Sequence, residues 1–458
     1  GRSRTRVHGL VSETANGTYI VEYTVTISGL YEIKVSLGDL PIKGSPFAMQ
    51  ALPADARASH SVAFGRNGSM QVATAGELNE FYILAKDTYG NQEHASAAVV
   101  GNFTVLMHGP GGLTAPASVR DQLDGMYAVE FEPTASGIYS IDVLFNQLHV
   151  YGSPYTTLVQ PGPAHPPHSL VLCPKTGPCA TKRGVAGELQ HFQVRARDSN
   201  KNPCRHGGAA VAAVLSAVKS HRKGHKSEAE HQSEAAASYP VEVLDTGDGL
   251  YTVQYRVNQA DTYRLAVTMD GEHIEDGPFT TVVDPGASCA SRTVVVGNNA
   301  HVAVAGQLTR VRIRAADCYG NPQKVGGDLF AVTLTRTPQT VLGSFVDNGD
   351  GSYDITYNLT TRGQWLLHVK TGGVHIAGSP FTVSALPGAT DPASSFATGP
   401  GLSKAFTGED SMFIVRTRDA HGNDKASGGD AVTATLMQAG TAEVVHANVT
   451  DTGEGSYS

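Results

Sequence analysis

The strongest constraint in this sequence is a short phrase that returns four times at regular intervals. A glycine, followed by a serine in three of the copies, stands before a proline and an aromatic residue in KGSPF, YGSPY, EDGPF and AGSPF. The four pairs are Pro46 and Phe47, Pro154 and Tyr155, Pro278 and Phe279, and Pro380 and Phe381. A catalytic site is needed once, whereas a phrase that returns roughly every hundred residues is typical of a repeated architecture.

Two further marks recur in step with this phrase. A tyrosine after a turn signal stands 27 residues before each of the four prolines, so no insertion or deletion separates the two marks. These tyrosines are Tyr19, Tyr127, Tyr251 and Tyr353, and a fifth copy ends the series at Tyr457. Upstream, an aspartate opens DTYGN, DSNKN, DCYGN and DAHGN, at Asp87, Asp198, Asp317 and Asp419.

The marks divide the chain into five units. We expect the C-terminal half of a repeat, three complete repeats and the N-terminal part of another, at 1–52, 53–161, 162–285, 286–386 and 387–458. Repeat 162–285 carries about 15 extra residues, which we assign to an inserted loop at about 217–239. Because both ends cut through a repeat, we expect a segment of a longer array.

Alternating side chains predict short β-strands within each unit. In YIVEYTV, for example, Tyr19, Val21, Tyr23 and Val25 fall on one face of a strand and the polar residues Glu22 and Thr24 on the other. No stretch shows a convincing helical period. Short strands between Gly, Asn and Asp turns, in units of about 100 residues, predict an all-β chain of antiparallel, immunoglobulin-like sandwiches. The only tryptophan, Trp365, stands where other units carry Tyr31, Tyr139 and Tyr263.

The order of the motifs resembles the filamin-type immunoglobulin repeat. D-x-x-G-N is followed by D-x-G-D-G-x-Y, a G-x-Y strand and H-I-x-G-S-P-F, best matched by DNGDGSY and GGVHIAGSPF in repeat 286–386. Repeat 162–285 departs from the pattern with EDGPF and DSNKN. The resemblance covers nearly the whole chain and implies a tandem array of filamin-type β-sandwiches. It includes no actin-binding calponin-homology domain, so actin cross-linking is not carried over.

The resemblance also implies how such an array binds. Filamin-type repeats accept an extended segment of a protein partner as an added strand at the edge formed by strands C and D. The matching C strands are expected at about 103–107, 211–215, 330–334 and 432–436. The edge residues we single out are Phe103, Val105, Val211, Phe330, Val332 and Val432.

Other classes of function find little support in the sequence. A net charge of −8 over 458 residues, without a basic patch, argues against nucleic-acid binding. The longest apolar run, AAVAAVLSAV from Ala209, is about half of the ~20 residues of a membrane-spanning helix. Motifs for a nucleophile, a phosphate loop or a zinc protease are missing, so we expect no catalytic residues and no cofactor.

Two stretches have a partial likeness to metal sites. DNGDG from Asp347 follows the start of a calcium loop but lacks its glutamate at position twelve, which favours a β-turn. In the inserted loop His221, His225 and His231 have a spacing that suits a metal on a helix face. Their Lys, Glu and Ala neighbours are also typical of a solvated loop, which is the interpretation we favour, and we assign no metal ligand.

Five cysteines lie in repeats 162–285 and 286–386. In an antiparallel first hairpin the start of strand A lies beside the end of strand B, which brings Cys289 near Cys318. Alignment on the D-x-x-G-N turns places Cys173 near the equivalent of Cys289 and Cys204 after the equivalent turn. We therefore predict disulfides Cys289–Cys318 and Cys173 (or Cys179)–Cys204, with buried thiols as the alternative. Disulfides would indicate an oxidising compartment.

N-glycosylation sequons also favour the cell exterior. Five occur, at Asn16, Asn67, Asn102, Asn358 and Asn448, about twice the number expected by chance. The compartment stays open between two interpretations. The first is a structural scaffold in a cytoskeletal or ciliary assembly. The second is an extracellular, glycosylated adhesion ectodomain, since filamin-type repeats also occur in gamete-surface proteins of plants and algae.

The repeated phrase itself is expected to connect the sixth strand to the last. Its glycine permits a bend, its proline fixes φ at a strand start, and its aromatic residue re-enters the core. On this interpretation Phe381→Ala should destabilise its repeat by ~3–5 kcal/mol. Proline-rich linkers such as ALPADA and ALPGATD predict a semi-stiff rod.

Overall fold

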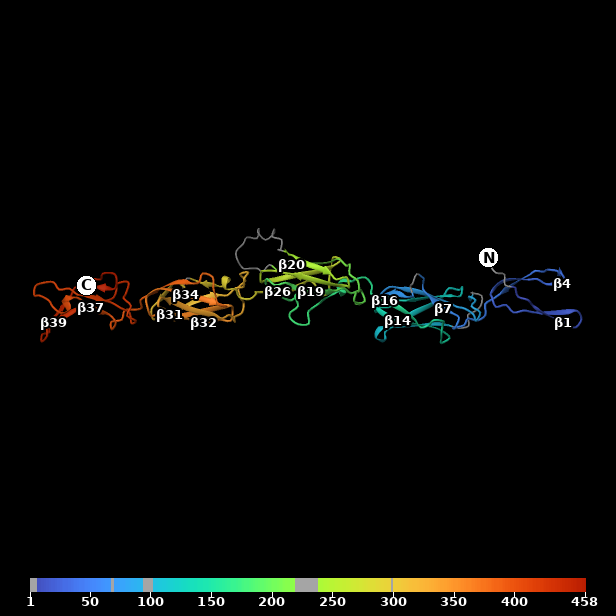
Figure 1. Cartoon of the computed structure of the whole chain (residues 1–458), viewed down its shortest axis with the longest axis horizontal. Helices are drawn as coiled ribbons and strands as arrows, with labels where there is room; N and C mark the ends of the chain where they lie inside the picture. Colours follow the sequence, from blue (N-terminus) through green and yellow to red (C-terminus); the bar gives the residue numbers. More distant parts are fainter. Residues whose placement is uncertain (1–5, 67–69, 94–101, 219–237, 298–299) are drawn as a thin grey trace.

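The structure is a computed structural model that describes residues 6–66, 70–93, 102–218, 238–297 and 300–458. Figure 1 shows an elongated chain in which three complete β-sandwiches follow one another in line. A half sandwich lies at each end of the array. Within the described residues, no helix is long and apolar enough to cross a membrane.

The first sandwich is built from β7 to β16. Its strands are β7 (Val62–Phe64), β8 (Val72–Thr74), β9 (Asn79–Leu84), β10 (Phe103–His108), β11 (Thr114–Ala115), β12 (Ala117–Asp121), β13 (Met126–Phe131), β14 (Gly137–Phe145), β15 (Leu148–His149) and β16 (Tyr155–Gln160). One sheet has the order β12-β13-β9-β7 and the other the order β11-β10-β14-β16-β8, with β15 paired to β14.

The second sandwich repeats this topology. Its strands are β17 (Leu170–Leu172), β18 (Arg183–Val185), β19 (Gln190–Arg195), β20 (Val211–Ala217), β21 (Ser238–Tyr239), β22 (Val241–Asp245), β23 (Leu250–Tyr255), β24 (Thr262–Met269), β25 (Glu272–His273) and β26 (Phe279–Asp284). The sheets have the orders β17-β19-β23-β22 and β18-β26-β24-β20-β21. The predicted insertion separates β20 from β21. Residues 219–237, which include His221, His225 and His231, lie outside the described residues.

The third sandwich has the same order of strands. These are β27 (Val294–Val296), β28 (Val302–Val304), β29 (Leu308–Arg314), β30 (Phe330–Arg336), β31 (Gln339–Leu342), β32 (Ser344–Asp347), β33 (Ser352–Asn358), β34 (Gly363–Thr371), β35 (Val374–His375) and β36 (Phe381–Leu386). Its sheets are β27-β29-β33-β32 and β28-β36-β34-β30-β31. The prediction of an all-β chain of antiparallel, immunoglobulin-like sandwiches is therefore confirmed.

The two terminal halves contain fewer strands. The N-terminal half has the hairpins β1 (Leu10–Thr14) with β2 (Thr18–Glu22) and β4 (Ser36–Leu37) with β5 (Leu40–Pro41), and the pair β3 (Gly29–Ile33) with β6 (Phe47–Ala51). The C-terminal half has β37 (Phe396–Thr398), β38 (Ile414–Arg416) and β41 (Ser456–Tyr457) in one sheet, and β39 (Thr435–Met437) with β40 (Val444–His446) in another. Short 3-10 turns lie at η2 (Pro110–Gly112), η3 (Pro166–His168), η5 (Ala290–Arg292) and η6 (Pro400–Leu402).

Each complete sandwich buries the alternating apolar side chains of its strands. In the third sandwich Ile355, Trp365 and Leu367 are almost fully buried. Trp365 keeps the hydrogen bond of the tyrosine that it replaces, because its Nε1 donates to the Thr361 carbonyl at 3.0 Å. The Tyr263 hydroxyl of the second sandwich likewise donates to a carbonyl four residues earlier, at 2.8 Å. A buried ring with one satisfied polar atom therefore fits this position in either form.

The tyrosine of the D-G-x-Y mark has a tertiary role beyond the turn. Tyr353 is buried, and its hydroxyl oxygen accepts a hydrogen bond from the Asp328 N–H at 2.9 Å. Burial raises the pKa of the Tyr353 hydroxyl above its ordinary value. The preceding DNGDG forms a turn in which the Gly349 N–H donates to Asp347 Oδ1 at 2.8 Å and Gly349 has a φ of 79°. Asp347, the first aspartate of DNGDG, therefore stabilises this turn.

The aspartate of the D-x-x-G-N mark organises the turn at the end of strand B. Asp317 Oδ1 accepts hydrogen bonds from the N–H groups of Tyr319 and Asn321, each at 2.9 Å. Burial alone would raise the pKa of Asp317, but donors from Asn321, Gly286 and Tyr319 outweigh it and hold the pKa below its usual value. The stabilisation is therefore fully present above about pH 4 and is lost as the pH falls through the lowered pKa.

Candidate functional site

In each complete sandwich strand C is the last long strand of the larger sheet, and only a short strand pairs with part of its outer side. Its inner side pairs with the long neighbouring strand, as β20 pairs with β24 from Val211 to Ala217. On the outer side β21 pairs with β20 only at Leu215 and Ser216. The first half of β20 is therefore an open strand edge within the described part of the chain.

The hydrogen-bond pattern shows which peptide groups face this open edge. The Asp270 N–H donates to the Ala210 carbonyl at 2.9 Å, and the Val218 N–H donates to the Thr262 carbonyl at 3.0 Å. Since residues of an antiparallel strand alternate in direction, the even-numbered residues of β20 bond to β24. The N–H and C=O of Ala213 point the other way, so they are the groups that an added strand would meet.

Aromatic packing distinguishes the edges of the other two sandwiches. Phe103 packs against Tyr127 and Phe145, with ring centroids 4.7 and 4.8 Å apart, and is 8% exposed. Phe330 packs against Tyr353 at 4.8 Å and is also 8% exposed. Val105 and Val332, two residues further along, are buried too.

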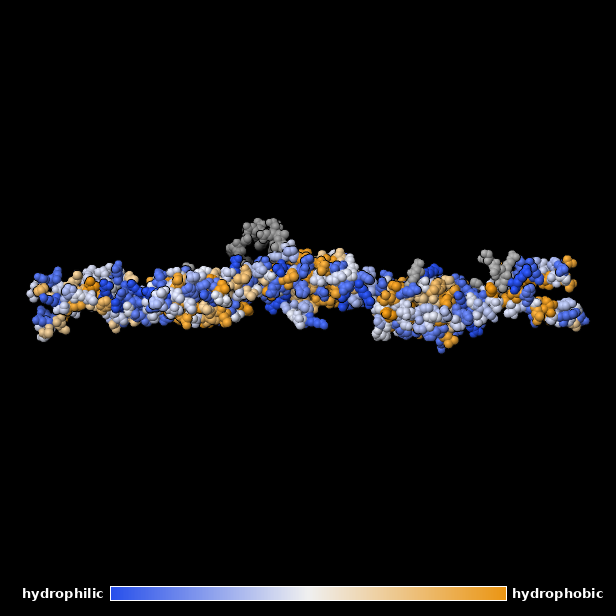
Figure 2. All heavy atoms as spheres, in the orientation of Figure 1, coloured by the Kyte–Doolittle hydropathy of each residue, from blue (hydrophilic) through white to orange (hydrophobic). Residues whose placement is uncertain are grey.

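The second sandwich has smaller side chains at the same place. Val211 and Ala213 of β20 are only half-buried, and so are Val241 and Val243 of β22, which lies against β20 from the other sheet. Figure 2 shows apolar side chains reaching the surface of this sandwich near β20. In the third sandwich the Gly343 N–H also bonds to the Val332 carbonyl at 3.0 Å, which shortens the open edge there. Among the described residues, the second sandwich therefore presents the most accessible C–D edge of the three.

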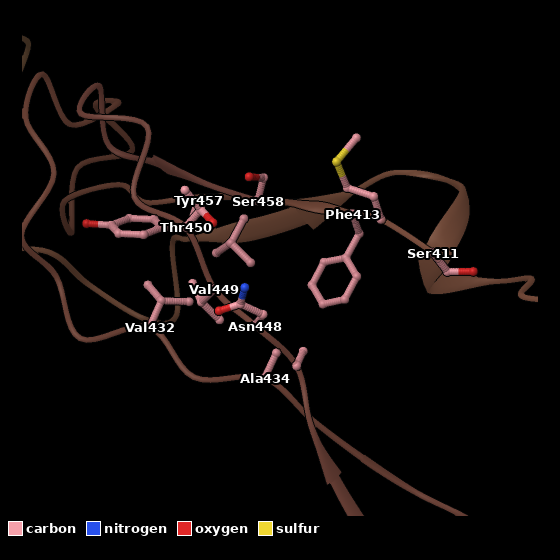
Figure 3. A pocket seen from close by; sticks show the side chains of 12 residues that line it. Ser411, Phe413, Val432, Ala434, Asn448, Val449, Thr450, Tyr457 and Ser458 are labelled. Carbon is pink, nitrogen blue, oxygen red and sulfur yellow. The ribbon is translucent and has the colours of Figure 1, made fainter. Parts of the chain in front are cut away.

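The predicted fourth edge, 432–436, is not a continuous strand. Val432 lies outside any strand, and β39 begins at Thr435 and pairs only with β40. In the complete sandwiches strand C pairs with a long strand that has no counterpart among the described residues of this half. Val432, Phe413 and Tyr457 line a cavity of about 250 Å³ in the half sandwich. Figure 3 shows these side chains around it.

Disulfides join two cysteine pairs. Cys289 at the start of strand A is bonded to Cys318 in the DCYGN turn, with Cα atoms 4.9 Å apart. The predicted pairing of Cys173 or Cys179 with Cys204 is wrong, because Cys173 and Cys179 are bonded to each other. Cys204 is a buried free thiol whose pKa is raised, first by burial and then by nearby Asp198.

The error has a simple structural cause. The residue that matches Cys289 is His165: the His165 N–H donates to the Arg197 carbonyl at 2.6 Å, as the Cys289 N–H donates to the Ala316 carbonyl at 2.7 Å. Cys173 follows β17 at the far end of strand A, next to the start of strand B. It cannot reach Cys204, which lies beyond the other end of strand B.

Four of the five sequon asparagines are exposed on the surface. These are Asn16, Asn102, Asn358 and Asn448. Asn67 lies outside the described residues. Accessibility is compatible with modification, and glycosylation of these asparagines stays a prediction.

The Gly/Ser-Pro-aromatic phrase leads into the last strand, but its aromatic residue is less buried than expected. Strands β6, β16, β26 and β36 begin at Phe47, Tyr155, Phe279 and Phe381, directly after the exposed prolines Pro46, Pro154, Pro278 and Pro380. Phe47 is 42% exposed and the other three rings are half-buried. Phe381 lies beneath Gly378 and beside His301, at the border of the core. A full core-truncation cost therefore does not apply to Phe381→Ala.

A tandem array of immunoglobulin-like sandwiches with open strand edges defines a class of structural and protein-binding chains. This chain belongs to the Filamin/ABP280 repeat family, whose pattern matches residues 1–48, 55–156, 168–280, 287–382 and 389–458. The family is structural and non-enzymatic, and its repeats bind protein partners.

Individual relatives agree with the family assignment. The chain is similar to Filamin-A of Drosophila melanogaster, with 26% identity over 409 residues that cover 88% of this chain and 16% of the relative. Filamin-C of Rattus norvegicus is 25% identical over 387 residues, which cover 83% of this chain and 13% of the relative. The chain thus spans about a sixth or less of the length of these relatives.

Solved structures give more distant likenesses. The Escherichia coli adhesin FdeC is 16% identical, with a TM-score of 0.47 and coverage of 73% of this chain and 99% of FdeC. The Lin-41 filamin domain is 19% identical, with a TM-score of 0.21 and coverage of 24% of this chain and all of that domain.

Proposed function

We propose that this chain is a non-enzymatic segment of a scaffold, a semi-rigid rod that spaces protein partners and binds them by strand addition. The repeats of this rod have the boundaries 53–161, 162–285 and 286–386, with partial repeats at 1–52 and 387–458. Its principal binding edge is β20 of the second sandwich. The observation that carries this proposal is the open edge of β20, where Ala213 presents its peptide group between half-buried apolar side chains.

The chemistry of this edge defines the partner. An extended segment would form main-chain hydrogen bonds with Ala213 and place alternate side chains against Val211 and Val243. Small or medium apolar side chains at every second position fit best, since the edge offers aliphatic and not aromatic neighbours. A partner segment of this kind is expected to be free of proline at the paired positions.

Selection of phage-displayed peptides on the whole chain tests the proposal. We expect selected peptides to protect the Ala213 amide from hydrogen exchange, and Ala213→Pro to weaken their binding at least tenfold. Proline at this position removes an edge N–H and spares the ladder to β24. The matched control is Val332→Pro in the third sandwich, the residue in register with Ala213, whose carbonyl already accepts a hydrogen bond from the Gly343 N–H. Full binding by Ala213→Pro, or protection confined to another surface, would contradict the proposal.

A second candidate function concerns the compartment. Two disulfides and four exposed sequon asparagines favour an extracellular adhesion segment over a cytoskeletal or ciliary one. Mass spectrometry of the native protein distinguishes the two. Bridged Cys289–Cys318 with glycans on Asn358 or Asn448 supports the extracellular candidate, and free thiols with bare asparagines support the intracellular one.

A further inference from the structure

At each junction between consecutive units, one asparagine reaches across to the preceding unit. At the junction of the second and third sandwiches this residue is Asn321, the last of the DCYGN turn. Its Oδ1 accepts a hydrogen bond from the Ala260 N–H at 2.9 Å, and its Nδ2 donates to the Asn258 carbonyl at 2.7 Å. Asn258 and Ala260 belong to the loop between β23 and β24 of the second sandwich. A single carboxamide therefore pairs with the backbone of another unit through both of its polar atoms.

The same contact recurs at all four junctions. The asparagines and the two residues that each one contacts are Asn91 with Thr26 and Ser28, Asn202 with Thr134 and Ser136, Asn321 with Asn258 and Ala260, and Asn423 with Thr360 and Arg362. All eight hydrogen bonds measure 2.7–3.0 Å. Since the partners are main-chain groups, the preceding loop needs no particular side chain. This explains why its sequence varies while the asparagine recurs.

The aspartate of the same turn binds the linker. Asp317 Oδ2 accepts hydrogen bonds from the Gly286 N–H at 2.9 Å and from Asn321 Nδ2 at 2.7 Å. The linker N–H groups at the other junctions, those of Ala54, Gly162 and Gly388, make the same bond to their aspartates at 2.8–3.0 Å. Asn321 is only 8% exposed, so these bonds are largely shielded from water. Two sandwiches and the linker between them thus meet at one aspartate–asparagine pair.

Close packing surrounds this pair. Gly187 of the second sandwich lies so near Tyr319 that a Cβ on Gly187 would approach the ring to 2.1 Å. Gly76 and Gly306 make the equivalent approach to Asn200 and His421. An ion pair between Lys324 and Asp284, at 3.7 Å, adds a further link at this junction.

We propose that the asparagine of each D-x-x-G-N turn fixes the orientation of its sandwich relative to the preceding one, and that this latch stiffens the array. The latch is the aspartate–asparagine pair together with the main-chain groups it binds across the junction. Without it, the linker and the remaining surface contacts, such as that of Gly187 with Tyr319, no longer fix one orientation, and consecutive sandwiches pivot about the linker. This inference rests on the proposed rod function and explains why the rod is stiff. The following experiment distinguishes failure of the latch from failure of the rod.

Electron–electron double resonance on the full chain measures the orientation directly. Spin labels on a ketone-bearing amino acid at the exposed, equivalent positions Leu244 and Val346 report on the second and third sandwiches and leave the native cysteines untouched. We expect one narrow distance distribution for the unsubstituted junction. Asn321→Ala should broaden that distribution at least twofold. It should also speed hydrogen exchange of the Ala260 amide about tenfold, since one hydrogen bond of ordinary strength is lost.

A second variant breaks the latch from the opposite side. Ala260→Pro removes the donor N–H and leaves the DCYGN turn intact, so it carries the test if Asn321→Ala disturbs the fold of the third sandwich. The matched control is Asn348→Ala, because the Asn348 side chain donates to Ser352 Oγ at 3.1 Å within its own sandwich and lies away from the junction contacts described above. A narrow distribution that stays narrow in both latch variants would overturn the latch and leave the rod standing. A broad distribution without any substitution would overturn both.

Discussion

The second and third sandwiches have the same strand order and the same turns, yet their C–D edges differ. In the third, Phe330 packs against Tyr353 and Phe345, with ring centroids 4.8 and 5.8 Å apart. In the second, the matching positions hold Val211 and Val243, and both are half-buried. Strand β31 also covers four residues of strand C in the third sandwich, whereas β21 covers two in the second.

This difference shows how a repeat can gain a binding surface without loss of its fold. The buried centre of each sandwich keeps large side chains, such as Tyr263 of β24 and Trp365 of β34. Strand C reaches this centre through Leu215 and Leu334, but near its start an aromatic ring closes the edge in the third sandwich and a valine leaves it accessible in the second. Stability and binding are therefore governed by different residues of the same unit.

The largest expected effect concerns the centre of the third sandwich. Trp365→Ala removes a ring that is 2% exposed and should destabilise this sandwich by ~3–5 kcal/mol. Hydrogen exchange, read by mass spectrometry for β33 and β19 separately, checks this. Faster exchange in β33 with unchanged exchange in β19 is expected. Equal acceleration in both would mean that the two sandwiches unfold as one unit.

The next effect in size is the loss of stability when the disulfides are reduced, which should differ between the two sandwiches. Cys289 and Cys318 are 29 residues apart in sequence, whereas Cys173 and Cys179 are only 6 apart. Loop-closure entropy predicts that reduction costs the third sandwich ~3.5 kcal/mol and the second ~2 kcal/mol. Chemical denaturation with and without reductant, followed through exchange in each sandwich, measures the two losses. A greater loss in the second sandwich would contradict this account.

The smallest expected effect concerns peptide binding, which substitutions at the two edges should weaken in the second sandwich and create in the third. Val211→Phe should close the edge of the second sandwich and weaken peptide binding about tenfold, ~1.4 kcal/mol. Phe330→Val should open the third sandwich and create weak binding there. Titration of each variant with one selected peptide compares the two. If Val211→Phe binds as tightly as the unsubstituted chain, the edge residue does not control access.

Much of the fold could be predicted because its signals are local. Alternation of apolar and polar residues around Tyr353 and Ile355 reflects the direction of successive side chains, which is a property of any strand. Turn residues such as Asp347 and Gly349 act through their own backbone neighbours. The family assignment rests on the order and spacing of these local signals.

Other features of the molecule required the tertiary structure. The bridge between Cys173 and Cys179 could not be predicted by alignment, since the match to Cys289 is a histidine at the other end of strand A. The open edge of β20 depends on how far β21 extends beside it. Phe381 belongs to the repeated Gly-Ser-Pro-aromatic motif, yet the exposed fraction of its ring depends on the residues that pack around it.

By itself, the sequence determined that this chain is an array of β-sandwiches with the same turns in each repeat. It did so because strand alternation and turn chemistry act over a few residues. The tertiary structure decided which cysteines are joined, which strand edge is accessible and what the D-x-x-G-N asparagine touches. Asn321 reads as one more turn residue in the sequence, and only the arrangement of two neighbouring sandwiches brings it against Asn258 and Ala260.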